Sequence, residues 1–152
     1  MMMRVLGIAA MLAIAAFAPA RAQVTMPADD LIEARQAGQD MLSGNFDGIR
    51  ATLAAKGDVT KVADAAKAMA RWARNLPTLF PPGTETLHNT HALPTVWSDH
   101  AGFIKAANDL ADAADKLSAL AKAGDAAGMA GQIKAVGAAC GACHRTYRQR
   151  TS

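Results

Sequence analysis

The chain has 152 residues, of which 51% are hydrophobic and 19% charged, and its formal net charge is +3. Residues 1–22 contain two arginines and no acid, so without them Lys+Arg falls from 16 to 14 against 13 Asp+Glu, and the net charge becomes +1. A charge this small gives no support to nucleic-acid binding.

Residues 1–22 have the pattern of a cleaved secretory signal peptide. Arg4 precedes an apolar run from Val5 to Phe17, and the small residues of Ala20-Arg21-Ala22 provide a cleavage site before Gln23. The alternative is a retained N-terminal anchor, but the apolar run is shorter than the roughly 20 residues that a membrane span needs. We therefore expect one mature domain at 23–152 in the periplasm, an oxidising compartment.

Two helices are predicted in the first half of the mature chain. The first follows Pro27 and ends before Gly57, which is a candidate C-cap. The second begins at Asp58 or Thr60 as N-cap, and Pro77 stops or kinks it. Both segments carry apolar residues at helical spacing, and no segment of the chain shows a convincing strand alternation.

A long loop and two further helices follow. Residues 76–96 contain four of the six prolines and no sustained period, which predicts a loop long enough to cover a ligand. Ser98 or Asp99 can cap the third helix, Gly124 ends it, and Asp125 can cap the fourth. Short turns at Gly57-Asp58 and Gly124-Asp125 favour antiparallel neighbours, so the predicted fold is all-α, an up-down-up-down four-helix bundle. Its faces are rich in alanine, and such a core can be completed by a large apolar ligand.

The two cysteines of the chain occur together in a Cys-x-x-Cys-His run, as Cys140, Cys143 and His144. On the fourth helix, these spacings place both thiols and the imidazole on one side, which we expect to be the buried face. Two thiols can add to the two vinyl groups of a haem, and the adjacent imidazole can bind its iron. The run therefore predicts covalent attachment of one haem c, with His144 as the proximal iron ligand.

Three other interpretations of this run are weaker. A thioredoxin-like dithiol starts a helix after a strand, whereas this pair is near the end of a helix. A structural zinc ion needs a fourth ligand, which only His88, His91 or His100 could supply from the loop region. A plain disulfide does not explain the adjacent His144.

Arg35 lies within the apolar stripe of the first helix, between Leu31 and Leu42. A buried guanidinium needs a negative partner, and a haem propionate could accept two parallel hydrogen bonds from it. The alternative is an arginine at the edge of the stripe that extends to solvent.

Together these features resemble the class II c-type cytochromes, the cytochrome c′ family, over essentially the whole mature chain. The resemblance is carried by "EARQAGQDMLSGNF" in the first helix, "LPTLFPPGTE" after the second, "VWSDHAGF" at the start of the third, and "CGACHRTYR" in the last. It implies that Arg35 meets a propionate and that Arg148 flanks His144. It also implies that Phe80 packs near the haem, with Trp97 and Phe103 closing the pocket.

The resemblance also identifies the distal position, four residues after Arg35, where this chain has Gln39. High-spin family members usually have an apolar residue there, and low-spin members a methionine ligand. Gln39 could instead hydrogen-bond a bound ligand or a water. Met41 lies about 200° further round the helix, while Met69 and Met129 belong to core stripes.

The expected function is therefore a periplasmic c-type cytochrome with five-coordinate, redox-active iron that binds the diatomic gases NO and CO. The alternative is a low-spin electron carrier with a methionine as sixth ligand and a periplasmic redox partner. Paired carboxylates or a nucleophile–base set are not apparent, so the sequence does not predict an enzyme. Family members are often dimers through their first two helices, which the exposed position expected for Met41 would allow.

Overall fold

The computed structural model describes residues 26–85 and 90–150, so the predicted signal peptide and His88 lie outside the described residues. Within these ranges the regular structure is helical. The β-type pairing in the described residues is an isolated antiparallel bridge between Ala92 and Arg148. The elements are α1 (Ala28–Ala54), η1 (Val59–Val62), α2 (Ala63–Asn75), η2 (Leu76–Leu79), α3 (Thr95–Ser98), α4 (His100–Lys122) and α5 (Ala126–Tyr147), where η is a short 3₁₀ helix.

Aspartate side chains cap the starts of three helices, because each accepts a hydrogen bond from a backbone N–H that the helix itself leaves unpaired. Asp58 accepts from Thr60 before η1, Asp99 from Gly102 before α4, and Asp125 from Gly128 before α5. Of the two predicted options for the third helix, Ser98 and Asp99, the structure has Asp99 as the cap of α4. The second helix begins later than predicted, because Asp58 caps the short η1 and α2 itself starts at Ala63 without a side-chain cap.

The end of α1 differs in detail from the prediction. The helix stops at Ala54, and the left-handed residue that reverses the chain is Lys56, with a φ of 51°, rather than Gly57. The amide of Gly57 closes the turn by donating to the carbonyl of Thr52 at 2.9 Å, as in a Schellman motif. At the end of α4, Gly124 has a φ of 70° and ends the helix as predicted.

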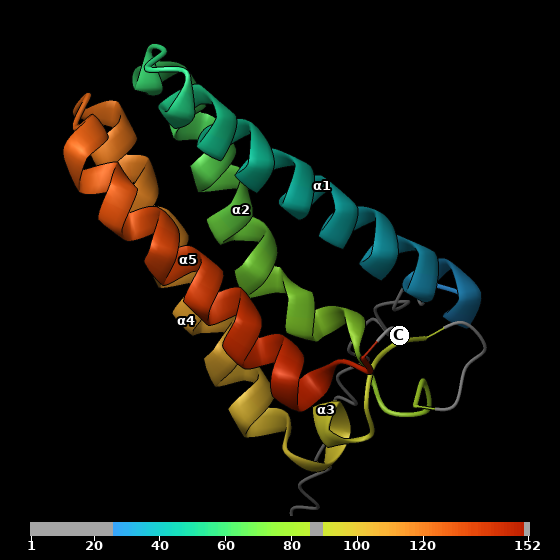
Figure 1. Ribbon diagram of the computed structural model, residues 1–152. Helices are drawn as coiled ribbons and strands as arrows, with labels where there is room; N and C mark the ends of the chain where they lie inside the picture. Colours follow the sequence, from blue (N-terminus) through green and yellow to red (C-terminus); the bar gives the residue numbers. More distant parts are fainter. Residues whose placement is uncertain (1–25, 86–89, 151–152) are drawn as a thin grey trace, which may run out of the picture.

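Helices α1, α2, α4 and α5 form an antiparallel bundle, which confirms the predicted all-α, up-down-up-down architecture (Figure 1). Helix α2 packs most extensively on α4 and α4 on α5, whereas α1 contacts mainly α2 and touches α5 over a short stretch. The start of α1, the end of α2 and the end of α5 lie at the same end of the molecule, near the C-terminus (Figure 1). The predicted loop at 76–96 connects α2 to α4 at this end and contains η2 and the start of α3.

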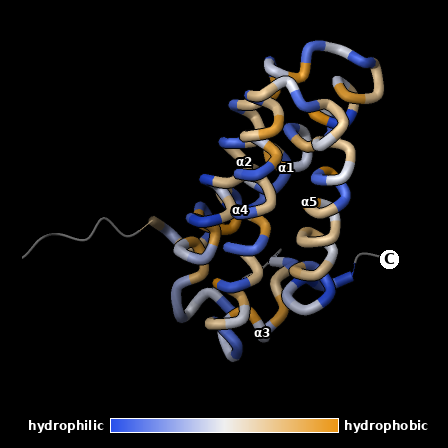
Figure 2. Tube along the Cα trace, turned by 90° about the vertical axis from the view of Figure 1, so that its left-hand side faces the viewer, coloured by the Kyte–Doolittle hydropathy of each residue, from blue (hydrophilic) through white to orange (hydrophobic). Residues whose placement is uncertain are grey.

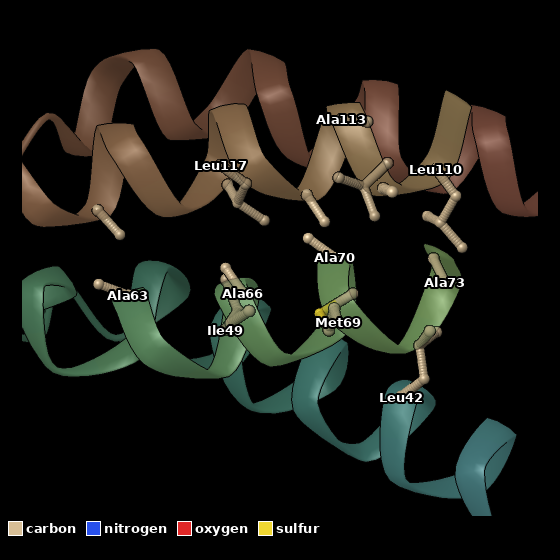
Figure 3. Close-up of a cluster of buried hydrophobic side chains, with 14 of the residues drawn as sticks. Leu42, Ile49, Ala63, Ala66, Met69, Ala70, Ala73, Leu110, Ala113 and Leu117 are labelled. Atoms are coloured by element: carbon tan, nitrogen blue, oxygen red, sulfur yellow. The ribbon is translucent and has the colours of Figure 1, made fainter. Parts of the chain in front are cut away.

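The main core is built around a close contact between α2 and α4. Figure 3 shows small side chains of α2, such as Ala66 and Ala70, facing α4, while Ile49 and Leu42 of α1 approach α2 from its other side. Alanine lets two helix backbones come close, and the larger Met69 and the leucines of α4 fill the remaining space. Figure 2 shows the outcome along the chain, with hydrophilic positions recurring between hydrophobic ones in every helix of the bundle.

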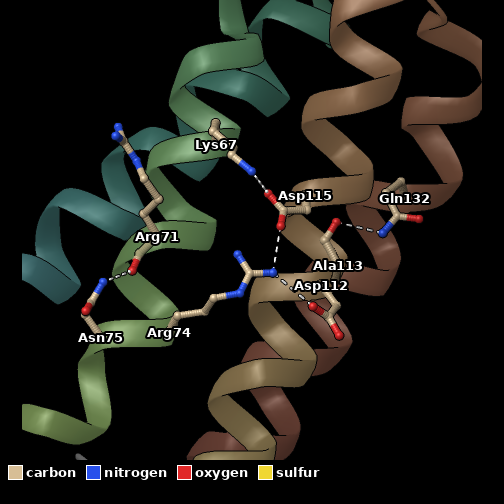
Figure 4. A network of polar contacts seen from close by, with 8 residues as sticks. All are labelled: Lys67, Arg71, Arg74, Asn75, Asp112, Ala113, Asp115 and Gln132. Carbon is tan, nitrogen blue, oxygen red and sulfur yellow. Dashed lines mark hydrogen bonds and ion pairs between the residues drawn. The ribbon is translucent and has the colours of Figure 1, made fainter.

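A polar network also joins α2 to α4 (Figure 4). Asp115 accepts from Lys67 at 2.8 Å and from Arg74 at 2.7 Å, and Arg74 also reaches Asp112 at 3.0 Å. Between α4 and α5, the side chain of Gln132 donates a hydrogen bond to the backbone carbonyl of Ala113 at 2.8 Å. These contacts fix α2, α4 and α5 as one unit.

A second, smaller core cluster occupies the end of the bundle near the C-terminus. Its buried members are Leu76, Val96, Phe103 and Tyr147, which come from η2, α3, α4 and α5. Among the described residues, no helix has both the length and the hydropathy needed to cross a membrane.

Candidate functional site

The Cys-x-x-Cys-His run lies in the last turns of α5. Cys140 packs against the main core and Cys143 against the smaller cluster at the end of the bundle. Both thiols are half-buried and free, so the pair is not a disulfide in this structure.

The environment of the two thiols does not suit thiol–disulfide exchange. Burial raises the pKa of Cys140, and burial together with the nearby Cys140 raises the pKa of Cys143 to about 11. Reactive dithiols have a lowered pKa, because the thiolate is the attacking species. These two thiols are therefore protonated at neutral pH before any covalent attachment.

His144 differs from the expectation that it lies on the buried face, because its side chain is exposed at the mouth of a cavity. The protein that surrounds one side of the ring partly desolvates it and lowers its pKa, and the positive charge of Arg148 lowers it further. A lowered pKa keeps the imidazole neutral at pH 7, and the neutral ring is the form that binds a metal.

This cavity has a volume of about 440 Å³ and brings together most of the predicted site residues. Six of the seven line it: Arg35, Gln39, Phe80, Cys143, His144 and Arg148. Cys140 lies one turn before Cys143 and is not part of the lining. Apolar side chains of Ile32, Leu76, Val96 and Phe103 form part of the walls. Polar residues also line the cavity, among them Asp40, Ser43, Thr90 and His91.

Arg35 is buried, with 5% of its surface exposed, which excludes the alternative of an arginine that extends to solvent. Its Nε donates to the carbonyl of Leu79 at 2.6 Å, and one terminal nitrogen donates to Oγ1 of Thr84 at 2.8 Å. The guanidinium also lies 4.0 Å from the centre of the Phe80 ring. Burial lowers the pKa of Arg35, whose other terminal nitrogen, NH1, is buried without a hydrogen-bond partner.

The unpaired nitrogen of Arg35 bears on whether a haem fits the site. A buried, positively charged donor without a partner is costly, and an acidic group entering the cavity would remove this cost. A haem has propionate carboxylates at one edge, vinyl groups for two thiols and an iron for one imidazole. The cavity lining combines a guanidinium with one unpaired nitrogen, a thiol, an imidazole and several apolar side chains, so the residues present fit a haem.

Aromatic rings surround Phe80 at the closed side of the cavity. Phe80 meets Phe103 edge-on, with ring centres 5.1 Å apart, and Trp97 at 5.8 Å. Phe103 lines the cavity as expected, whereas Trp97 lies behind Phe80, and its Nε1 donates to the carbonyl of Pro81 at 3.2 Å. Trp97 therefore supports the wall and does not form it.

The part of the lining that comes from α1 includes several polar side chains besides Ile32 and Arg35. Gln39 is half-buried and lines the cavity, and Ser43 lines it one turn later. The three methionines that were considered as ligands lie elsewhere. Met69 and Met129 are buried in the main core, and Met41 is 70% exposed beside a groove between α1 and α2.

Two features of the site were not identified from the sequence. Thr84, which is buried and bonds Arg35, comes from the proline-rich segment, where no periodicity marks a buried position. The second feature is the contact of Tyr147, in the last turn of α5, with Asp99, the cap of α4, because nothing in the sequence pairs these two residues. His91 lines the cavity and His100 begins α4, where Nδ1 lies 3.2 Å from the carbonyl of Val96. Within residues 26–85 and 90–150, no three His, Cys, Asp or Glu side chains are arranged to hold a metal ion.

Comparisons with known proteins identify the family of this chain. The family model of cytochrome c′ matches residues 30–148. Cytochrome c′ of Rubrivivax gelatinosus is 38% identical over 123 residues, which are 80% of this chain and 95% of that protein. A cytochrome c′ whose structure shows an unusual ligand-controlled dimer dissociation has a TM-score of 0.77 and 29% identity, covering 84% of this chain and 100% of that one. A nitric oxide complex of a variant of cytochrome c′ from Alcaligenes xylosoxidans has a TM-score of 0.73 and 28% identity, covering 82% and 97%.

The family model spans most of the chain, and the relative from Rubrivivax is similar over nearly its full length. The fold is the same as in the solved structures, and the two cysteines occur in the haem-attachment run. The chain therefore belongs to the cytochrome c′ family, whose members bind one covalently attached haem c.

Proposed function

We propose that this chain is a periplasmic cytochrome c′ that binds diatomic gases at a five-coordinate haem iron. Cys140 and Cys143 would attach the haem through thioethers, and His144 would be the proximal ligand. When bound, the haem would supply a redox-active iron that can take up NO or CO.

The observation that carries this proposal is the composition of the cavity on its two sides. His144 and Cys143 lie on the α5 side, and Arg35 and Gln39 lie on the α1 side. Arg35 would hold a propionate through its unpaired NH1 and so fix the orientation of the haem. Gln39 would provide an amide that can donate a hydrogen bond, and does not provide a strong ligand for iron. A related protein has been solved as a nitric oxide complex, which supports gas binding by this chain.

Optical spectra of the purified holoprotein test the proposal directly. We expect a high-spin ferrous spectrum that shifts when CO is added, because a free axial position accepts the gas. A low-spin ferrous spectrum that CO leaves unchanged would refute it. Failure to find covalent haem by mass spectrometry, after expression with haem-attachment machinery, would refute the assignment of Cys140 and Cys143.

The alternative function, electron transfer with a methionine as sixth ligand, has less support. Met41 would have to leave the groove between α1 and α2, and Met69 or Met129 would have to leave the main core. Each of these moves would require a change in the register or packing of a helix. The haem iron would be redox-active, so the proposal includes electron exchange with a periplasmic redox partner, but it assigns no residues to such a partner.

We also propose that the chain forms a homodimer through α1 and α2. A groove of about 360 Å³ between these helices is lined by Gly38, Met41 and Trp72, among others. Met41 is the most exposed large hydrophobic residue of the described chain, at 70%. A related cytochrome c′ is a dimer whose dissociation is controlled by ligand, which supports a dimer here and makes its ligand dependence worth measuring.

A further inference from the structure

The last turn of α5, which contains His144, is tied to the start of α4 by a partly buried side-chain contact between the buried Tyr147 and the exposed Asp99. The hydroxyl of Tyr147 donates to Oδ2 of Asp99 at 2.8 Å. The other carboxylate oxygen of Asp99 accepts the backbone N–H of Gly102 at 3.2 Å and so caps α4. One carboxylate therefore holds the first turn of α4 and the last turn of α5 together.

The packing around this contact leaves it little freedom. Tyr147 is only 8% exposed, and its ring meets Phe103 edge-on with centres 5.2 Å apart. A side chain at Gly102 would collide with the carboxylate of Asp99 and the hydroxyl of Tyr147. Glycine at this position is thus what allows Asp99 and Tyr147 to meet beside the helix.

Backbone contacts hold the same turn from the other side. The carbonyl of Tyr147 accepts from the amide of Leu93 at 3.0 Å, and the hydroxyl of Thr95 donates to the carbonyl of Thr146 at 2.6 Å. The amide of Gln149 donates to the carbonyl of His91 at 2.7 Å. The final turn of a helix frays when its terminal carbonyls lack partners, and here the segment before α4 supplies those partners.

We propose that Asp99 and Tyr147 form a positioning pair for His144, and this inference rests on the proposed role of His144 as proximal ligand. Tyr147 follows His144 by three residues, so the two side chains are neighbours on the surface of α5, and both line the cavity. By fixing Tyr147 to α4, Asp99 restricts the tilt of the last turn and with it the direction from which the imidazole meets the iron. Neither residue touches the iron, and both act through the backbone of α5.

The test uses the covalent holoprotein and the iron–histidine stretching band of its ferrous form, measured by resonance Raman spectroscopy. Tyr147→Phe removes the hydroxyl and keeps the ring that packs on Phe103. Asp99→Ala removes the acceptor together with the α4 cap. We expect both variants to shift or broaden the band, and the double variant to change it no more than the larger single change, because the two residues act through one contact.

Asp125→Ala is the matched control. Asp125 caps α5 in the same manner, accepting the amide of Gly128 at 2.8 Å, but it lies at the far end of the helix and bonds no tyrosine. Its removal should lower the thermal midpoint and leave the iron–histidine band in place. Losing the cap of α4 or the cap of α5 should cost a similar free energy of unfolding. A change of the iron–histidine band in Asp99→Ala but not in Asp125→Ala would therefore reflect positioning of His144 and not a loss of stability.

Three results would overturn the inference or its basis in distinguishable ways. An unchanged band in Tyr147→Phe holoprotein would refute the positioning pair. A shift of equal size in Asp125→Ala would also refute it, because general loosening of the helix would then suffice. An iron–histidine band that persists in His144→Ala would refute the proposed proximal ligand itself, whatever the other variants show.

Discussion

Gly38 in α1 allows close contact between α1 and α2, and replacing it should separate the two helices. A Cβ atom at this position would lie inside the indole ring of Trp72, against three of its carbon atoms. Trp72 is half-buried and packs against both core clusters. The ring therefore cannot move without disturbing the main core or the wall of the cavity.

The size of the effect follows from two opposing terms. Alanine in place of glycine inside a helix stabilises the folded protein by about 0.5–1 kcal/mol. Overpacking a filled contact costs about 1–3 kcal/mol. For Gly38→Ala we therefore expect the free energy of unfolding to fall by about 0–2.5 kcal/mol. Arg35 and Gln39 share this helix with Gly38, so a displaced α1 should also weaken CO binding by the holoprotein.

Gly44→Ala is the matched control, because Gly44 lies in the same helix with nothing within 4 Å of its added Cβ. It should gain the helix-propensity term of about 0.5–1 kcal/mol without the overpacking term. Urea denaturation of the two holoproteins measures the difference, which we expect to be about 1–3 kcal/mol. If Gly38→Ala were as stable as Gly44→Ala, the close approach of α1 and α2 at Trp72 would be wrong.

Three further predictions concern ligation, pH and assembly. Gln39→Met should convert the ferrous iron toward low spin and reduce its response to CO; an unchanged spectrum would mean that Gln39 does not face the iron. Hydrogen bonds from Lys67 and Arg74 lower the pKa of Asp115, so its contribution to stability is present above the ordinary aspartate pKa of about 3.9 and is lost as the pH falls through the lower folded value. Asp115→Asn should thus reduce the free energy of unfolding by about 0.5–1 kcal/mol at pH 7, and the two proteins should converge once the pH falls below the lowered pKa of Asp115; a difference that stays the same from neutral pH into strong acid would contradict this. Met41→Glu should shift sedimentation from dimer to monomer at equal protein concentration while the haem spectrum stays the same, and a persistent dimer would place the interface elsewhere.

Much of the fold could be predicted because its signals are local. The aspartate caps before η1, α4 and α5 work through amides two or three residues away, so the sequence near each helix start contains both partners. Lys56 shows the limit of such rules, since a left-handed turn favours glycine, yet the neighbouring Gly57 is used to close it instead.

The chemistry of the haem-attachment run was likewise determined by sequence alone, because Cys140, Cys143 and His144 share one helix whose geometry relates them. What faces them was decided only by the tertiary structure. The stripe of α1 placed Arg35 near the core but left open whether it was buried, and its partners Leu79 and Thr84 lie 44 and 49 residues away. The contact between Asp99 and Tyr147 spans 48 residues. Helical periodicity fixes where a side chain points around its own axis, but only the packing of one helix or loop against another brings such distant groups together.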